Sequence, residues 1–280
     1  MIKRSFLVFV LLAAAYALFI HFVDPDWDTT QHLQNGNRIK AEEFLFSPDD
    51  PQATVIVGSS LAYRIELDSL PKNTWNLGFG GLSIYDGLEL INRAGRTPGL
   101  VLIETNVLFR SPDEGFLDAL FEPGLYHARR SVPIMREENQ PSGVLYGWIR
   151  RSLLKNAGTD RSEEEEGEPN QVMLQEHRAN YALLPAKEEQ EAFIGTLRAG
   201  VNELEKRGVK VVFFEIPIHE ELEEMPLSEL GRDLVTTHFP DHAFLRMERR
   251  KWNTTDGLHL AKRDAHVFSG ELARWIESLQ

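Results

Sequence analysis

Short, unbroken apolar runs alternate along this chain with segments whose apolar residues recur at helical spacing. Unbroken runs of this length are typical of strands that are buried on both faces of a sheet. They predict four strands, over residues 53–58, 73–81, 99–106 and 209–217. Apolar residues that recur every three or four positions predict three helices, over residues 82–95, 188–208 and 261–280.

Strands that alternate with helices indicate an α/β protein with a parallel sheet. We therefore predict a flavodoxin-like three-layer sandwich with a central parallel sheet over residues 53–280. An insertion at about 111–185 interrupts it, with one candidate helix at 142–156 and little other regular pattern. The insertion also carries an acidic run, in which Glu163–Glu166 predict a mobile, solvated loop.

The N-terminus carries a longer apolar run, from Ser5 to Val23, with His21 as its only strongly polar member. A helix needs roughly 17–25 apolar residues to cross a bilayer, and this run meets that length. A cleaved signal peptide is the alternative, since Ala15–Ala17 resembles a cleavage site. Because the apolar run continues beyond Ala17, we favour an uncleaved membrane anchor over residues 1–23, followed by a polar stalk over 24–52.

Charges on the two sides of the apolar run predict its orientation. Lys3 and Arg4 precede it, and three acidic residues follow it at Asp24, Asp26 and Asp28. Basic residues favour the cytoplasmic side of a membrane. We therefore expect a single-pass protein of the cytoplasmic membrane whose main domain lies in the periplasm or another extracytoplasmic space.

Composition excludes several classes of function. The net charge of -13, without a long basic block, argues against nucleic acid as a partner. The 280-residue chain has no cysteine, so thiolate metal sites and cysteine nucleophiles are excluded. No histidine spacing predicts a metal site, and we expect no metal and no organic cofactor. We interpret four histidines as surface or local hydrogen-bonding residues: His219, His238, His242 and His266.

Polar and glycine residues gather where the predicted strands end. The first strand runs into Gly58-Ser59-Ser60, the second ends at Gly78–Gly81, and the third ends at Glu104-Thr105-Asn106. A loop before the last helix carries Asp256 and His259. Functional residues collect at the carboxyl ends of strands in parallel sheets, so these groups are expected to meet.

Together these residues form a chemically coherent set. A serine hydroxyl becomes a good nucleophile when a nearby imidazole accepts its proton. A carboxylate can fix the tautomer of that imidazole, and Asp256 is well spaced to do so for His259. Backbone N–H groups and an asparagine amide can stabilise the developing oxyanion.

The ordered motifs "GSSL", glycine, asparagine and "DGLHL" resemble the SGNH hydrolases, also called GDSL esterases, over roughly residues 53–280, apart from the insertion. This resemblance implies the SGNH hydrolase fold, with Ser60 as nucleophile, His259 as base and Asp256 as its orienting acid. It implies an oxyanion hole built from Ser60, Gly81 and Asn106.

The sequence departs from the family pattern at two places. Ser59 occupies the position where the family usually has Asp, and "ETNV" at 104–107 replaces the usual Gly-x-Asn-Asp. In the second block, Gly80 is an alternative to Gly81.

An anchor, an extracytoplasmic body and a "GSS" nucleophile are similar in plan to SGNH proteins that acylate cell-surface polymers. These include alginate, cellulose and peptidoglycan O-acetylation proteins and the D-alanine transfer proteins of teichoic acids. The analogy implies O-acyl transfer, most simply O-acetyl transfer, to an exported polysaccharide, with a multi-span membrane acyltransferase as partner. Two alternatives stay open: an esterase that removes acyl groups from glycan or lipid, and a non-catalytic scaffold subunit.

Overall fold

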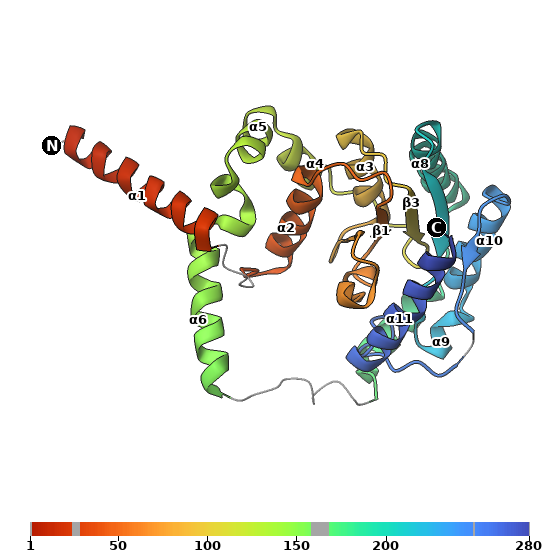
Figure 1. The fold of residues 1–280 in the computed structure, drawn as a ribbon. Coiled ribbons are helices and arrows are strands. Elements are labelled where there is room, and N and C mark those ends of the chain that lie inside the picture. The colour runs from red at the N-terminus through yellow and green to blue at the C-terminus, as the bar shows by residue number, and fades with distance from the viewer. Residues whose placement is uncertain (1, 24–28, 158–167, 249, 280) are drawn as a thin grey trace. The chain divides into compact units, whose positions relative to one another are not determined.

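A five-stranded parallel sheet organises the larger part of the protein in the computed structural model, which describes residues 2–23, 29–157, 168–248 and 250–279 (Figure 1). Its strands are β1 (Thr54–Gly58), β2 (Thr74–Gly78), β3 (Leu100–Glu104), β4 (Lys210–Phe214) and β5 (Phe244–Leu245). The order β2-β1-β3-β4-β5, with every pair parallel, is the flavodoxin-like order. The predicted α/β fold class and four of the strands are confirmed; β5 was not predicted.

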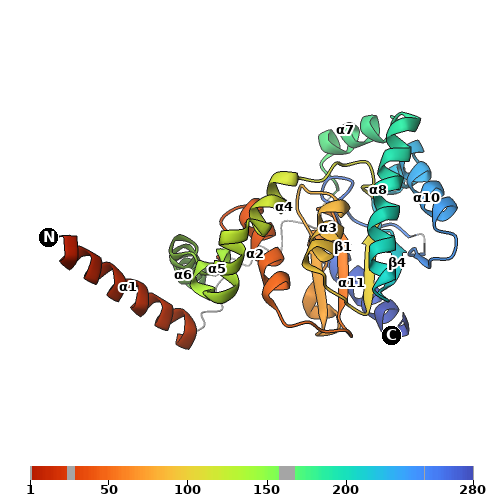
Figure 2. The ribbon, with the colours of Figure 1, turned by 90° about the horizontal axis from the view of Figure 1, so that it is seen from above.

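Helices cover both faces of this sheet (Figure 2). One face packs on α3 (Ile84–Ala94) and α8 (Lys187–Lys206), and α3 approaches β1 closely where Gly87 lies against Val57. The other face packs on α11 (Lys262–Leu279). Its core joins sheet residues to helix residues and includes Ile56, Leu102, Val212, Phe214, Phe268, Leu272 and Ile276. The three predicted helices are therefore present and form the outer layers of the sandwich.

Local signals explain where α3 begins and ends. Ser83 and Asp86 form a capping box at its start, with the Ser83 N–H donating to the Asp86 carboxylate at 2.8 Å. Gly95 ends the helix with φ +66°, a left-handed conformation that glycine adopts without steric cost. Asp86 is fully buried, and its second oxygen accepts the N–H of Asp113 at 2.7 Å.

The described residues divide into two compact units. The sheet unit comprises residues 47–118 and 160–280, and the second unit comprises residues 1–46 and 119–159. The sheet unit also contains α7 (Gln171–Tyr181), α9 (Glu220–Glu223), α10 (Pro226–His238) and two 3-10 turns, η1 (Ala62–Arg64) and η2 (Leu67–Ser69). Helix α4 (Glu114–Phe121) includes residues of both units.

The second unit is helical. It contains α1 (Ile2–Val23), α2 (Leu33–Phe46), α5 (Pro123–Ser131) and α6 (Pro141–Ala157), with 3-10 turns η3 (Pro133–Met135) and η4 (Glu137–Asn139). Glu42 of α2 is buried, accepts the N–H of Glu137 at 2.6 Å and pairs with Arg129 at 3.3 Å. Residues 33–46, which lie within the expected stalk, thus form a helix that packs on residues from the expected insertion.

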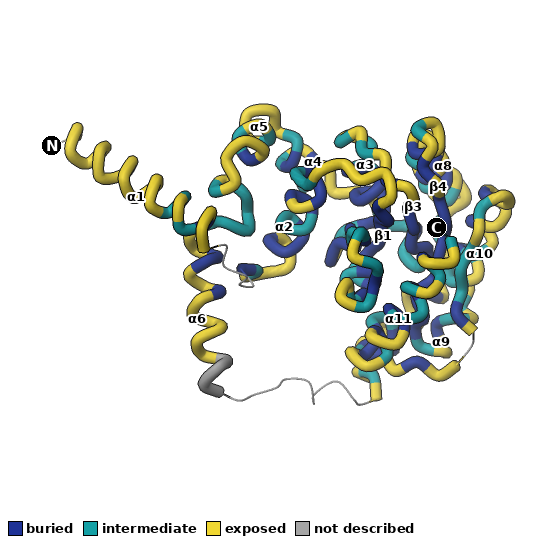
Figure 3. The backbone as a smooth tube through the Cα atoms, viewed as in Figure 1, coloured by how far each residue is buried: buried dark blue, intermediate teal, exposed yellow. Residues whose placement is uncertain are grey.

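Helix α1 is exposed along most of its length, in contrast to the buried strands (Figure 3). With 22 residues it is long and apolar enough to cross a membrane. An N-terminal signal sequence can have the same length and composition. The apolar helix is therefore present, and its fate in the cell stays a prediction.

The expectation of little regular structure in 111–185 is wrong, because this region contains α4, α5 and α7 in addition to α6, which covers the predicted helix at 142–156. Two of these helices begin at an N-cap residue whose side chain accepts backbone N–H groups of the first turn. The Glu122 carboxylate accepts the N–H of Leu125 at 2.9 Å, ahead of Pro123 in the first turn of α5. The Asn170 side chain accepts two N–H groups at the start of α7. The acidic residues Glu163–Glu166 lie outside the described residues.

Candidate active site

The turn after β1 presents Ser60 at the carboxyl edge of the sheet. The Ser59 carbonyl accepts the N–H of Tyr63 at 3.1 Å, so the chain turns at once into η1. Gly58 makes this turn possible: a Cβ there would overlap Ala62 and come within 2.7 Å of a Glu104 carboxyl oxygen. The strand-end glycine is therefore required by close packing.

A second loop, between Thr254 and Leu260, carries the acid and the imidazole. An antiparallel bridge joins Thr254 to Leu260 and closes the loop. Inside it, one Asp256 carboxyl oxygen accepts the N–H of Leu258 at 3.0 Å and the N–H of His259 at 2.8 Å. Gly257 has φ +99°, which a residue with a side chain adopts only under strain. These backbone contacts therefore orient the Asp256 carboxyl independently of its contact with the His259 ring.

The structure brings Ser60, His259 and Asp256 into one hydrogen-bonded chain. The second Asp256 oxygen lies 2.7 Å from His259 Nδ1, and His259 Nε2 lies 3.0 Å from Ser60 Oγ. A carboxylate can only accept, so Nδ1 carries the proton and Nε2 is free to accept the Ser60 hydroxyl proton. Arg64, on the turn after Ser60, donates to the Leu260 carbonyl at 3.1 Å and links the two loops.

Electrostatics favour a charged acid in this chain. Burial of the Asp256 carboxyl acts to raise its pKa, but hydrogen bonds from the His259 ring and from two backbone N–H groups outweigh burial and hold the pKa well below its usual range. An ionised Asp256 can stabilise an imidazolium at His259. The His259 side chain is 21% exposed, so part of it reaches solvent.

The predicted oxyanion-hole residues occupy the ends of neighbouring strands. Gly81 follows β2 with φ +76°, and Asn106 follows β3. The Asn106 amide donates to the Ile216 carbonyl at 2.8 Å and accepts the Ile216 N–H at 2.8 Å, so it ties the ends of β3 and β4 together. Neither residue is hydrogen-bonded to Ser60 in the described part of the chain. Their role towards an oxyanion, and the choice between Gly80 and Gly81, stay predictions.

Glu104 is the residue that sequence reasoning missed. It ends β3, has no exposed surface, and its carboxyl accepts the N–H of Ser59 at 2.7 Å. Burial raises its pKa, and the hydrogen bonds from Ser59 and Ala62 act against that rise. The available signal was the glutamate that replaces glycine in the third block, next to a serine that replaces aspartate in the first.

A second Ser–His–carboxylate group lies in the same unit but cannot relay a proton in the same way. His266 Nδ1 lies 2.7 Å from a Glu66 carboxyl oxygen and 3.5 Å from Ser69 Oγ. Because one ring nitrogen serves both partners, the ring does not bridge them as His259 does. The His266 side chain is also 68% exposed, as expected of a surface histidine.

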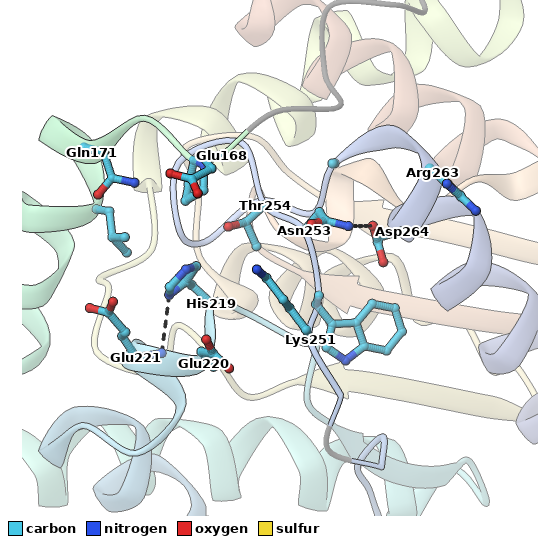
Figure 4. Close-up of a pocket in the computed structure, with 14 residues that line it drawn as sticks. Glu168, Gln171, His219, Glu220, Glu221, Lys251, Asn253, Thr254, Arg263 and Asp264 are labelled. Carbon is cyan, nitrogen blue, oxygen red and sulfur yellow. Dashed lines mark hydrogen bonds between the residues drawn. The ribbon is translucent and has the colours of Figure 1, made fainter.

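A cavity of about 490 Å³ adjoins the loop that carries Asp256 and His259 (Figure 4). Its lining is mostly polar and includes His219, Lys251, Asn253, Thr254 and Asp264. Trp252, just before the loop, contributes to the lining but is almost fully buried, and the Arg250 guanidinium lies 3.6 Å from the centre of its ring. Ser60 and His259 do not line the cavity. Among the described residues, no three His, Asp or Glu side chains are grouped to hold a metal ion.

Comparisons with known proteins give a structural likeness and no sequence relative. No protein family and no curated protein matches the chain. A candidate acylhydrolase from Bacteroides fragilis is similar at 12% identity and a TM-score of 0.45, over 89% of this chain and 99% of its own. A GDSL-like lipase from Bacteroides thetaiotaomicron is similar at 12% identity and a TM-score of 0.44, over 89% of this chain and 100% of its own. A likeness this distant does not establish an activity.

Proposed function

We propose that this protein is a serine-dependent acyl-ester enzyme of SGNH type, with Ser60 as nucleophile, His259 as general base and Asp256 as the orienting acid. The observation that carries the proposal is the continuous chain Ser60 Oγ–His259 Nε2 at 3.0 Å and His259 Nδ1–Asp256 at 2.7 Å. Ser60 lies in one loop, and Asp256 and His259 lie in another that is far from it in the sequence. The distances between the three side chains are those of an activated nucleophile.

The first half of the reaction transfers the acyl group to the enzyme. His259 Nε2 takes the Ser60 proton while Oγ bonds to the acyl carbonyl carbon, and the carbonyl electrons move onto oxygen. The oxyanion is stabilised by N–H donors, for which Ser60, Gly81 and Asn106 are the proposed sources. The oxyanion then collapses, the ester C–O bond breaks, and the imidazolium returns its proton to the leaving oxygen.

The second half of the reaction decides between transfer and hydrolysis. An acceptor hydroxyl gives its proton to His259, attacks the acyl-enzyme carbonyl and displaces Ser60 Oγ, which recovers the proton. We propose that a polysaccharide hydroxyl, rather than water, is the principal acceptor. The polar cavity is lined by Asn253 and Thr254, where the loop that carries Asp256 and His259 begins, and it supports a hydroxyl-rich ligand near this site. Hydrolysis is the second candidate, favoured by the solvent exposure of the His259 side chain.

The N-terminal helix supports a location at the membrane. We propose that α1 anchors the chain in the cytoplasmic membrane with the sheet unit outside the cytoplasm, because Lys3 and Arg4 precede the apolar residues. A multi-span membrane acyltransferase is the proposed acyl donor partner. Protease added to intact spheroplasts should cleave the sheet unit, and a mature protein that begins after Ala17 would contradict the anchor.

Replacement of the nucleophile tests the mechanism. Ser60→Ala should lower kcat on an activated acetyl ester by on the order of 10⁶ and abolish labelling by a fluorophosphonate probe. Ser69→Ala is the matched control, since it removes the hydroxyl of the exposed Ser69–His266 pair and should leave both readouts unchanged. Undiminished turnover in Ser60→Ala would refute the mechanism, and an unlabelled, inactive wild type would favour the scaffold alternative.

Product analysis separates the two enzymatic candidates. The wild-type protein is supplied with an acetyl donor and a glycan acceptor, and both free acetate and acetylated glycan are measured. Acetylated glycan that depends on Ser60 supports transfer. Release of acetate alone, at a rate that the acceptor does not change, supports the esterase.

A further inference from the structure

The Glu104 carboxyl has no exposed surface and lies against residues 59–62, the turn that carries Ser60 and is called here the nucleophile turn. The register of the sheet sets Val57 of β1 beside Ile103 of β3, so the next residues, Gly58 and Glu104, end the two strands side by side. Since Gly58 has no side chain, the Glu104 carboxyl occupies the space above it. The position of Glu104 is therefore a consequence of strand pairing and of the glycine that precedes the two serines.

The Glu104 carboxyl is surrounded by donors from the nucleophile turn. One oxygen accepts the Ser59 N–H at 2.7 Å and the Ala62 N–H at 3.4 Å. The Ser59 hydroxyl lies 2.9 and 3.0 Å from the two carboxyl oxygens, and it accepts the N–H of Leu61 at 3.2 Å. These contacts constrain the residues on both sides of Ser60 without touching Ser60 itself.

From this geometry we infer that Glu104 is a positioning residue: its buried carboxyl holds the 59–62 turn in the conformation that delivers Ser60 Oγ to His259. The inference rests on the proposed function, because it assigns Glu104 to the same reaction. Burial of a carboxyl is costly unless donors satisfy it, and the donors that contact it here, among the described residues, belong to one turn. SGNH proteins usually have an acid at the position of Ser59. This chain has no carboxyl there, and Glu104 of the neighbouring strand supplies one instead.

The first test replaces one acceptor oxygen of the carboxyl and keeps the shape of the side chain. In Glu104→Gln, an amide N–H₂ replaces one acceptor oxygen and faces donors of the turn. Displacement of a reacting group by about 1 Å can cost on the order of 10² in rate, so kcat on an acetyl ester should fall by about that factor while KM changes little. The rate of fluorophosphonate labelling at Ser60 should fall in parallel.

A matched control separates positioning from general stability. Glu42 is also a buried carboxyl that accepts a backbone N–H, but it lies in the helical unit. Glu42→Gln should lower the melting temperature and leave kcat unchanged. A kcat for Glu104→Gln within about tenfold of the wild-type value, or a loss confined to KM, would overturn the inference.

A reciprocal exchange tests the carboxyl directly. Because the Ser59 hydroxyl touches both carboxyl oxygens, a carboxyl built on residue 59 would enter the space that Glu104→Gly opens. The double variant Ser59→Asp with Glu104→Gly should recover kcat by about tenfold or more over Glu104→Gly alone. A double variant no faster than the single one would overturn the inference. Wild-type protein that neither turns over the ester nor labels would contradict the proposed function itself, a different result from an active wild type matched by Glu104→Gln.

Discussion

Asp256→Asn is the substitution whose effect the geometry fixes most closely. In the wild type, one Asp256 oxygen accepts two backbone N–H groups of its own loop, at 3.0 and 2.8 Å, and the other accepts His259 Nδ1–H at 2.7 Å. Asparagine can keep the first oxygen and therefore the loop. Its amide N–H₂ then faces Nδ1, and two donors cannot pair.

The substituted loop would therefore select the wrong tautomer of His259. Nδ1 must become the acceptor, which leaves the proton on Nε2, the nitrogen 3.0 Å from Ser60 Oγ. That nitrogen can no longer take the serine proton. Loss of this kind in a Ser–His–Asp triad costs on the order of 10⁴ in kcat, or about 5.4 kcal/mol of transition-state stabilisation.

The assay is turnover of an activated acetyl ester at neutral pH, with a fluorophosphonate labelling rate as a second readout. Asp256→Asn should still fold, because the two backbone contacts of the loop are kept, but its melting temperature at neutral pH should fall, because the ionised carboxylate no longer contributes to stability. A correctly folded Asp256→Asn protein with kcat within about tenfold of the wild type would refute the proposed orienting role of the carboxylate.

Three further predictions follow from the packing and the charges. Gly58→Ala should cost about 1–3 kcal/mol of stability, measured by denaturant unfolding, because its Cβ would lie 2.7 Å from a Glu104 oxygen; an unchanged midpoint would show that the turn can relax. Phe268→Ala should cost about 3–5 kcal/mol of stability in the same assay, since this α11 side chain is 1% exposed in the core between α11 and the sheet; a loss below about 1 kcal/mol would contradict that packing. The lowered pKa of Asp256 means that its ionisation adds stability above the unfolded value of about 3.9, and this contribution is lost as the pH falls below that value. An acid titration of stability should therefore be shallower for Asp256→Asn than for the wild type, and parallel curves would refute the linkage.

The sheet could be predicted because its strands are buried on both faces. Continuous apolar runs mark β1, β3 and β4, and each observed strand lies within its predicted range. The two-residue strand β5 has no such run, since two residues cannot display a periodicity. It is held in the sheet by pairing of Phe244 with Phe213, a long-range contact that no local pattern records.

Helix α6 covers the helix predicted at 142–156, but α4, α5 and α7 of the 111–185 region, and the extent of α2, escaped prediction for a related reason. Helix α7 buries only Leu174 and Tyr181, seven residues apart, so its apolar stripe is too thin to recognise. Helix α2 carries many polar residues yet buries Glu42, whose partners lie in residues 129–137. Such packing depends on the fold and cannot be read from a local window.

The candidate site shows the same division between local and distant information. The pairing of Asp256 with His259 is local, since three residues separate them, and their spacing made the interaction predictable. Glu104 acts on Ser59 across 45 residues, through the parallel register of β1 and β3. The sequence showed two departures from a motif, and only the fold shows that they touch.

The distance along the chain between the proposed nucleophile and its proposed base has a consequence during synthesis. Ser60 and His259 are 199 residues apart in the sequence. At about 5–20 residues per second, the ribosome therefore adds His259 roughly 10–40 s after Ser60. A nascent chain that emerges N-terminus first thus carries an unactivated serine throughout that interval. If Ser60 is the nucleophile, it therefore cannot be activated by His259 until synthesis of the chain is almost complete.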